Sequence, residues 1–168
     1  LGTCITKYVY KFGDYNSLFD TPGDSITQGS PYDEVLTAGW GNDIVITGGG
    51  KDQILLNEQA NGLTTVNDFT LGNDLIVLRG WSMADPLADL VIGDVADGAE
   101  LQFAGQRVLL KGVSAASVQA NPAAVITKSD IYTLAWNSGK QVVQGFDPAV
   151  DKIAGSAGIG FKHLKAYE

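Results

Sequence analysis

Short apolar segments separated by glycine, aspartate and asparagine run along most of this chain. Residues 5–12 alternate between apolar and polar side chains and include aromatics, which indicates a β-strand. Further strand-like segments follow, namely apolar triplets within 35–57, then VNDF, DLIVL, ADLVI, AELQFA and QRVLLKGV, and finally residues 131–136 and 142–146. Only residues 114–125 are compatible with a helix, and Pro122 limits its length. The pattern predicts an all-β fold with a turn every 8–12 residues.

A short repeat lies within residues 21–57. Four aspartates, Asp24, Asp33, Asp43 and Asp52, are spaced 9, 10 and 9 residues apart, and an apolar β-former stands two residues after each. The last two units share a frame whose glycine positions are Gly39, Gly41, Gly48 and Gly50. A nine-residue period gives one turn and one short strand, so two periods complete one coil of a flattened solenoid. We therefore expect Asp24 and Asp43 to stack on one edge, and Asp33 and Asp52 on the other.

The segments GWGNDIVIT and GGGKDQILL resemble the RTX, or hemolysin-type, nonapeptide repeat G-G-x-G-x-D-x-U-x. That resemblance implies a short parallel β-roll with Ca²⁺ in the turns, continuous here with antiparallel or sandwich-like strands. Glycines allow positive φ, and the stacked turns offer carboxylate and carbonyl oxygens, which calcium prefers. The eight residues just named, four Asp and four Gly, are the expected metal site. Without metal, carboxylates stacked this closely would repel one another.

A longer repeat relates two parts of the chain. VNDFTLGNDLI at 66–76 aligns with VQGFDPAVDKI at 143–153, so that Asp74 corresponds to Asp151. ITKYVY at 5–10 similarly resembles ITKSDIY at 126–132. We interpret residues 1–125 as a first β unit containing the calcium repeats. Residues 126–168 would then begin a second, truncated copy without them, with an unpaired strand at 161–167. Asp74 and Asp151 are expected to cap turns.

The flanking segments suggest a setting for these units. DFTLGNDLIVL resembles the segment that follows the roll in many type-I-secreted bacterial exoproteins, and YTLAWNSGKQVVQGFDPAVDKI is similar to modules appended to secreted bacterial enzymes that act on chitin and other polysaccharides. These resemblances imply a non-catalytic, calcium-binding accessory module, located outside the cell and attached to a parent enzyme domain. Alternatives are a carbohydrate-binding module or a segment of an adhesin or surface layer. For carbohydrate binding, the candidate stacking side chains are Trp40, Trp81 and Trp136.

Catalysis is not expected of the chain itself. GDSITQG at 23–29 copies the nucleophile block of GDSL-type esterases, with Ser25 in the nucleophile position. The segment before it is polar, however, and no Asp-x-x-His follows, because Gly160 stands three residues before His163. A serine without a histidine base lacks its usual activation. Glutamate is also scarce, with 4 Glu against 15 Asp. Paired carboxylates for glycoside hydrolysis stay an open alternative.

The composition of the chain argues against several classes of binding partner and metal site. The net charge of −8 argues against nucleic acid and anionic membranes. With one Cys and one His, a zinc site or a Cys/His dyad is nearly excluded. No apolar run approaches the length of a membrane span. The chain begins at Leu1 and shows no signal peptide, so we interpret it as a mature or excised fragment.

Overall fold

The computed structural model describes residues 5–8, 17–18, 23–58, 62–83, 85–129, 131–134 and 152–155. The chain divides into two units, Leu1–Lys128 and Ser129–Glu168. The sequence placed this division slightly earlier, after residue 125.

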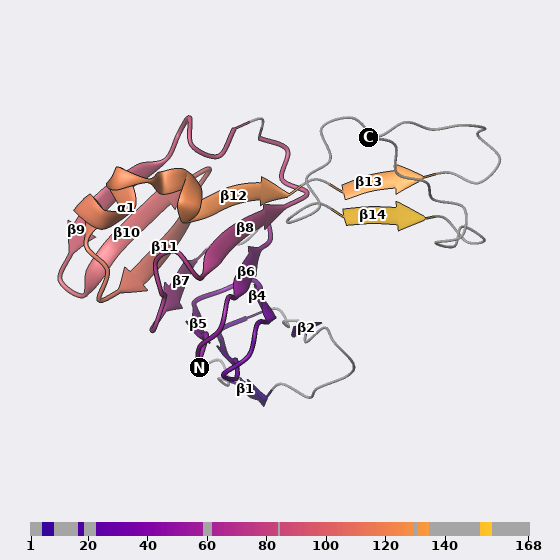
Figure 1. The fold of residues 1–168 in the computed structure, drawn as a ribbon, viewed down its shortest axis with the longest axis horizontal. Helices are drawn as coiled ribbons and strands as arrows, with labels where there is room; N and C mark the ends of the chain where they lie inside the picture. The colour runs from indigo at the N-terminus through magenta and orange to yellow at the C-terminus, as the bar shows by residue number, and fades with distance from the viewer. Residues whose placement is uncertain are drawn as a thin grey trace. The chain divides into compact units, whose positions relative to one another are not determined.

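The first unit is built around two β-sheets (Figure 1). The seven-stranded sheet has the order β1 (Ile5–Tyr8), β3 (Ser25–Gln28), β5 (Asp43–Ile46), β7 (Leu63–Val66), β11 (Gln106–Lys111), β10 (Gly98–Phe103) and β9 (Val91–Val95). The five-stranded sheet has the order β12 (Ile126–Ser129), β8 (Leu75–Arg79), β6 (Gln53–Leu56), β4 (Val35–Ala38) and β2 (Ser17–Leu18). The predicted all-β fold is confirmed.

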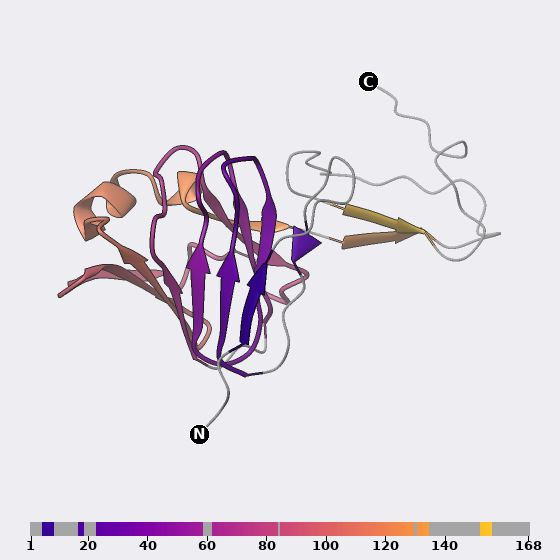
Figure 2. The same ribbon diagram turned by 90° about the horizontal axis from the view of Figure 1, so that it is seen from below.

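From β1 to β8, successive strands belong alternately to the two sheets. The neighbours within each sheet are parallel, as the side-by-side arrows of Figure 2 show. Ile26 lies beside Ile44 in one sheet and Leu36 beside Ile54 in the other, so both sheets repeat with the same offset along the chain. We call one return of the chain to the same sheet a winding. The next winding contains more residues in both sheets. Asp43 pairs with Thr64 and Gln53 pairs with Leu75, so these partners lie further apart along the chain than those of the preceding winding.

The core lies between the two sheets. Alternate residues of β4, β5 and β7 are buried, and the side chains of Val45, Val66, Leu36, Ile54 and Ile76 have no solvent exposure. All five belong to one hydrophobic cluster that joins both sheets. Burying each such side chain contributes about 1.5–3 kcal/mol relative to leaving it exposed. The apolar residues two after Asp43 and Asp52, namely Val45 and Ile54, belong to the core that holds the windings together, whereas Ile26 and Val35, two after Asp24 and Asp33, are half-buried.

An antiparallel meander extends the seven-stranded sheet. β9, β10 and β11 pair in antiparallel fashion, and β11 joins β7 in parallel. The β10–β11 turn places Ala104 and Gly105 at positive φ, of 45° and 81°, which two-residue hairpin turns require. β10 and β11 match the predicted segments AELQFA and QRVLLKGV, whereas β9 begins only near the end of the predicted segment ADLVI, residues 88–92. The predicted helix is also present as α1 (Ala115–Ala120), and a 3₁₀ turn, η1 (Pro122–Ala124), follows it.

In the second unit the structure describes two strands. β13 (Ile131–Leu134) pairs in parallel with β14 (Lys152–Gly155). Lys152, the first residue of β14, aligns in the long repeat with Leu75, the first residue of β8, which pairs in parallel with β6. The long repeat thus relates two strands with the same kind of pairing. The strands predicted at 142–146 and 161–167 lie outside the described residues.

Candidate metal site in the turns between the sheets

The turns between the sheets form two edges. The first edge comprises residues 23–24 and 39–42, and the second edge residues 29–34, 47–52 and 67–74. Backbone hydrogen bonds tie successive turns together on both. On the first edge, Gly23 N donates to Trp40 O at 2.8 Å. On the second edge, Leu75 N donates to Asp52 O at 2.8 Å. Side chains from neighbouring windings are therefore held close to one another.

Asp43 and Asp52, the aspartates of the two intact glycine frames, are buried; Asp43 begins β5, directly after the first edge, and Asp52 lies in the second edge. Each is 1% exposed. Asp43 Oδ1 accepts hydrogen bonds from the backbone N of Ser25 at 3.0 Å and from its Oγ at 2.8 Å. Asp52 Oδ1 accepts one from the backbone N of Glu34 at 2.9 Å. Each carboxylate thus bridges its own turn to the turn of the preceding winding.

Asp24 and Asp33 do not occupy the equivalent position, which corrects the expected stacking. The expected partners are Asp43 for Asp24 and Asp52 for Asp33. In the sequence, each pair is separated by one residue more than the residues that lie side by side in the paired strands. Asp24 Oδ1 therefore accepts the backbone N–H of Asn42 at 2.7 Å, and Asp33 Oδ1 that of Lys51 at 2.8 Å. Both aspartates are exposed.

The second edge holds acidic side chains that the sequence analysis did not assign to the site. Glu34 is in register with Asp52 and is 4% exposed. Asp74 is in register on the other side, where its Oδ1 accepts the N–H of Asp52 at 3.2 Å and its Oδ2 that of Thr70 at 2.8 Å. The bond to Thr70 is the turn cap expected of Asp74. Asp68 accepts the N–H groups of Thr47 and Gly48. Glu34 can be recognised as a residue of this edge only when the register between windings is known, because the register is what places it beside Asp52. Asp151 lies outside the described residues.

The predicted glycines differ in their roles. Gly41 and Gly50 have positive φ, of 116° and 97°, and a Cβ on either would come within 3 Å of the backbone of the preceding winding. Gly48 has positive φ as well, whereas Gly39 does not. Three of the four glycines therefore provide the turn conformation expected of them.

The electrostatics of the second edge centre on Asp52. Burial is the largest cause that raises its pKa, and the neighbouring charge of Asp74 adds to it, giving a value of about 7. Burial also raises the pKa of Asp74. The Oδ2 atom of Asp52 is buried and has no hydrogen-bond partner. An ionised carboxylate in this position is destabilised unless a cation or a proton neutralises it.

The acidic residues of the two edges provide some, but not all, of the ligands that a metal cation needs. Within the described portions of the chain, no group of three or more His, Cys, Asp or Glu side chains is placed to hold a metal ion. The carboxylates alone thus do not enclose a metal, and a hard cation would also need backbone carbonyl oxygens. The buried, unpartnered Oδ2 of Asp52 is nevertheless the atom that a cation would satisfy. Cys4 and His163 lie outside the described residues.

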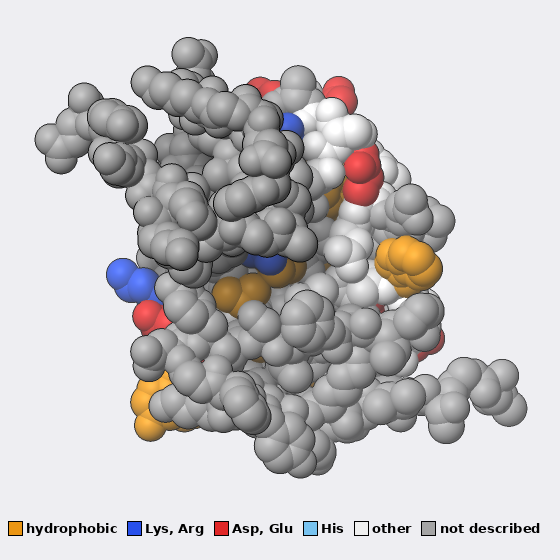
Figure 3. Space-filling view, turned by 90° about the vertical axis from the view of Figure 1, so that its right-hand side faces the viewer, with side chains coloured by type: hydrophobic (Ala, Val, Ile, Leu, Met, Phe, Trp, Pro, Cys, Tyr) orange, Lys and Arg blue, Asp and Glu red, His pale blue; other side chains and the backbone are white. Residues whose placement is uncertain are grey.

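Of the candidate tryptophans that the structure describes, one is exposed. Trp81 is 2% exposed, packs against Phe103 with ring centroids 5.7 Å apart, and donates its Nε1–H to Leu56 O at 2.8 Å. It is a core residue, which corrects its assignment as a ligand-stacking side chain. Trp40, on the first edge, is 45% exposed. On the face in Figure 3, the hydrophobic side chains of the described residues reach the surface in separate small groups. Trp136 lies outside the described residues.

Ser25, in the esterase-like block, is 1% exposed, and its Oγ donates to Asp43. A buried hydroxyl bonded to a structural carboxylate cannot meet an ester. Ser25→Ala is therefore expected to leave the rate of p-nitrophenyl acetate hydrolysis unchanged. Turnover that disappears in the variant would show that Ser25 is a nucleophile after all.

Comparison of the chain with family models, with curated proteins and with solved structures finds no match. Among the described residues, no helix is long and apolar enough to cross a membrane.

Proposed function

We propose that residues 23–79 form a calcium-binding β-roll, and that the chain is a non-catalytic accessory module of a secreted bacterial enzyme or exoprotein. The observation that carries the proposal is the buried, unpartnered Oδ2 of Asp52 on an acidic edge. Asp43 and Asp52 would supply the main carboxylates, and Ca²⁺ would neutralise charges that otherwise repel. The alternating parallel strands and the glycine turns support the β-roll. The antiparallel meander supports its sandwich-like continuation.

Calcium should stabilise the chain. Extracellular modules bind Ca²⁺ with Kd values of roughly 10⁻⁴–10⁻³ M. At about ten times Kd, one site adds on the order of 1.4 kcal/mol, which corresponds to a rise in Tm of about 3–6 °C for a chain of this size. The measurement is a thermal melt with excess Ca²⁺, with the same concentration of Mg²⁺, and with EDTA.

Variants locate the site. Asp43→Asn and Asp52→Asn should reduce the calcium-induced rise in Tm, and Asp74→Asn should reduce it less, because both Asp74 oxygens already accept hydrogen bonds. Asp89→Asn is the matched control, since Asp89 is an exposed carboxylate away from both edges. An unchanged Tm in calcium would end the metal proposal. Equal losses in all four variants would place the site elsewhere.

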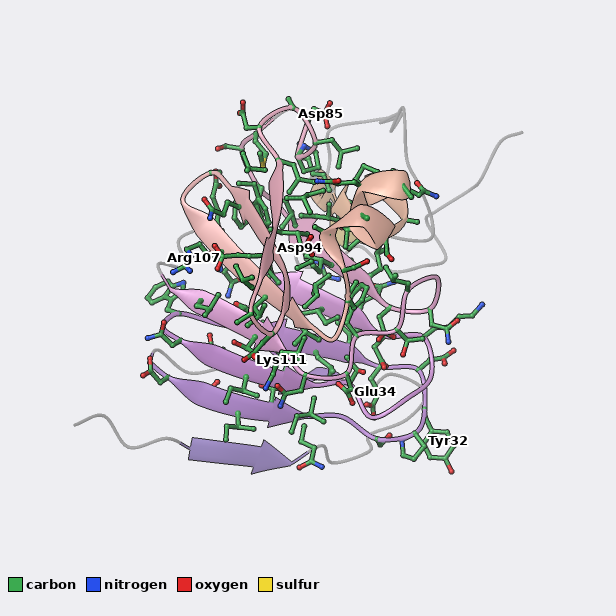
Figure 4. All side chains as sticks on the ribbon, turned by 90° about the vertical axis from the view of Figure 1, so that its left-hand side faces the viewer. Tyr32, Glu34, Asp85, Asp94, Arg107 and Lys111 are labelled. Atoms are coloured by element: carbon green, nitrogen blue, oxygen red, sulfur yellow. The ribbon has the colours of Figure 1, made fainter. Side chains whose placement is uncertain are left out.

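Carbohydrate binding is the second candidate, and the exposure of Trp40 is what favours it. The indole lies in a turn whose backbone is tied to Gly23, so its face is presented with little loss of conformational freedom. We expect Trp40→Ala to abolish retention of the chain on insoluble chitin. Tyr32→Ala is the control, because Tyr32 is a 63% exposed aromatic on the second edge and projects from its turn in Figure 4. If wild type is not retained, or if both variants are retained equally, this function fails.

A further inference from the structure

β9 is the last strand of the seven-stranded sheet, and no described strand pairs with its far side (Figure 1). Val91 and Val95 are 61% and 43% exposed, and Gly93 between them is exposed as well. Ile92, which alternates with them, packs against the core, so these three residues lie on the other face of the sheet. A Cβ on Gly93 would meet nothing within 4 Å. The outer face of β9 therefore presents two aliphatic side chains with a gap between them.

The backbone of β9 directs every second residue away from β10. A two-residue turn joins the two strands and pairs Val95 with Gly98, so Val95 and every second residue before it exchange hydrogen bonds with β10. Ile92 and Asp94 direct their N–H and C=O groups to the far side. In agreement with this, Gln119 of α1 donates an Nε2–H to Ile92 O at 3.1 Å. The two N–H groups and the carbonyl of Asp94 are available to another strand, because no bond within the described part of the chain engages them.

β9 has few of the features that usually keep an edge strand from pairing. Such strands are protected by Lys, by Pro, by a bulge or by a charge that points inward. β9 reads VIGDV and pairs with β10 without interruption, so Asp94 is its one protective residue. The Oδ1 atom of Asp94 accepts the N–H of Ala115 at 2.7 Å, which holds the charge beside α1. A neutral or acidic partner strand would meet this charge as an obstacle, whereas a basic side chain opposite it would gain a contact.

The surroundings of β9 are acidic as well. Residues 85–98 contain four Asp and no Lys or Arg, and all four Asp are exposed. A second copy of the chain fits poorly, because antiparallel pairing that sets Val91 opposite Val95 would set Asp89 opposite Asp97. Like charges directly opposite one another destabilise a strand pair, and each copy carries a net charge of −8. Charge complementarity instead favours a basic partner.

We propose that β9 is a docking edge for another protein, which adds to the sheet an extended segment of alternating basic and apolar side chains. The apolar side chains would lie opposite Val91 and Val95, and a large one opposite Gly93 would fill the gap. The basic side chains would alternate with them, on the side of Asp94. Main-chain hydrogen bonds to Ile92 and Asp94 would supply affinity, and the side chains specificity. The edge involves none of the proposed calcium ligands and stands independently of that function.

The test is a titration of the full chain with a blocked heptapeptide, Lys-Val-Lys-Phe-Lys-Val-Lys, and with its counterpart in which Glu replaces every Lys. Excess Ca²⁺ is present throughout, so that the chain is folded whether or not it needs the ion. Amide hydrogen exchange, followed by NMR, locates the contact. We expect only the Lys peptide to bind and, at about 90% saturation, to slow exchange of the Ile92 and Asp94 amides about tenfold. The Gly93 amide, which already bonds to β10, should change little.

Matched variants assign the side-chain contacts. Val91→Lys combined with Val95→Lys should weaken binding of the Lys peptide by about tenfold, because two apolar cross-strand pairs are lost and like charges are added. Tyr32→Lys combined with Leu71→Lys adds the same charge at exposed apolar residues of other turns and should bind almost as wild type does. Tyr32 lies far from Asp94 in Figure 4. Asp94→Asn should weaken binding several-fold, although its side-chain oxygen can still accept the N–H of Ala115.

The proposal is overturned if the Lys peptide does not bind at up to about 1 mM, if the Glu peptide binds equally well, or if the Ile92 and Asp94 amides stay unprotected at saturation. Retained affinity in the double variant of β9 would overturn it as well. So would sedimentation of the full chain as a dimer that this double variant dissociates, because a second copy would then occupy the edge.

Discussion

Gly62→Ala is expected to lower the stability of the chain by on the order of 3 kcal/mol, which corresponds to a fall in Tm of about 6–12 °C. A Cβ at this position would lie 1.8 Å from the carbonyl oxygen of Gly41 and 2.5 Å from its carbonyl carbon. The obstacle is backbone of the neighbouring winding, which no side-chain rotation can move aside. Chemical denaturation followed by circular dichroism measures the change.

Gly29→Ala should behave similarly, since its Cβ would lie 2.2 Å from Thr47 O on the second edge. Gly93→Ala is the matched control. Gly93 lies in the middle of β9 and a Cβ there meets nothing within 4 Å, so alanine should be neutral or slightly stabilising. Similar losses for Gly62→Ala and Gly93→Ala would mean that the windings are not packed this closely.

The sequence pattern predicts the elements better than it predicts their register. The apolar segments after the repeat aspartates are sufficient to identify the strands, and the burial of Leu36, Val45 and Ile54 between the sheets helps to hold them together. The same pattern places Asp43 and Asp52 in turns. Asp52 lies directly before β6, whereas Asp43 is the first residue of β5, and both are buried.

The pattern does not show that one winding is a single residue shorter than the spacing between Asp24 and Asp43. Because of this one-residue difference, Ser25 and not Asp24 lies beside the carboxylate of Asp43, and Glu34 and not Asp33 lies beside that of Asp52. Register depends on which backbone groups pair across the sheet, and an exposed and a buried aspartate look alike in the sequence. Trp81 illustrates the same limit, because its partners Leu56 and Phe103 belong to strands far from it along the chain.

Asp52→Asn should have opposite effects with and without calcium. In calcium-free buffer, an acid whose pKa is about 7 in the folded state and about 3.9 unfolded is fully stabilising only below about pH 3.9. That stability is lost as pH rises from about 4 to about 7, by up to roughly 4 kcal/mol. Asparagine removes this loss but leaves an amide to satisfy, at about 1–3 kcal/mol. At about pH 8, the variant should therefore be roughly 1–3 kcal/mol more stable than wild type without calcium.

With excess calcium, the difference in stability between Asp52→Asn and wild type should reverse or vanish. The ion would stabilise wild type by binding its ionised carboxylate, and asparagine offers no such charge. Urea unfolding at about pH 5 and about pH 8, with and without Ca²⁺, measures all these effects. Asp89→Asn again removes one charge from the surface and should shift stability by at most a few tenths of a kcal/mol. A calcium-free Asp52→Asn chain that is less stable than wild type at about pH 8 would show that the ionised carboxylate is not destabilised by its burial, and the main support for a cation at the second edge would be lost.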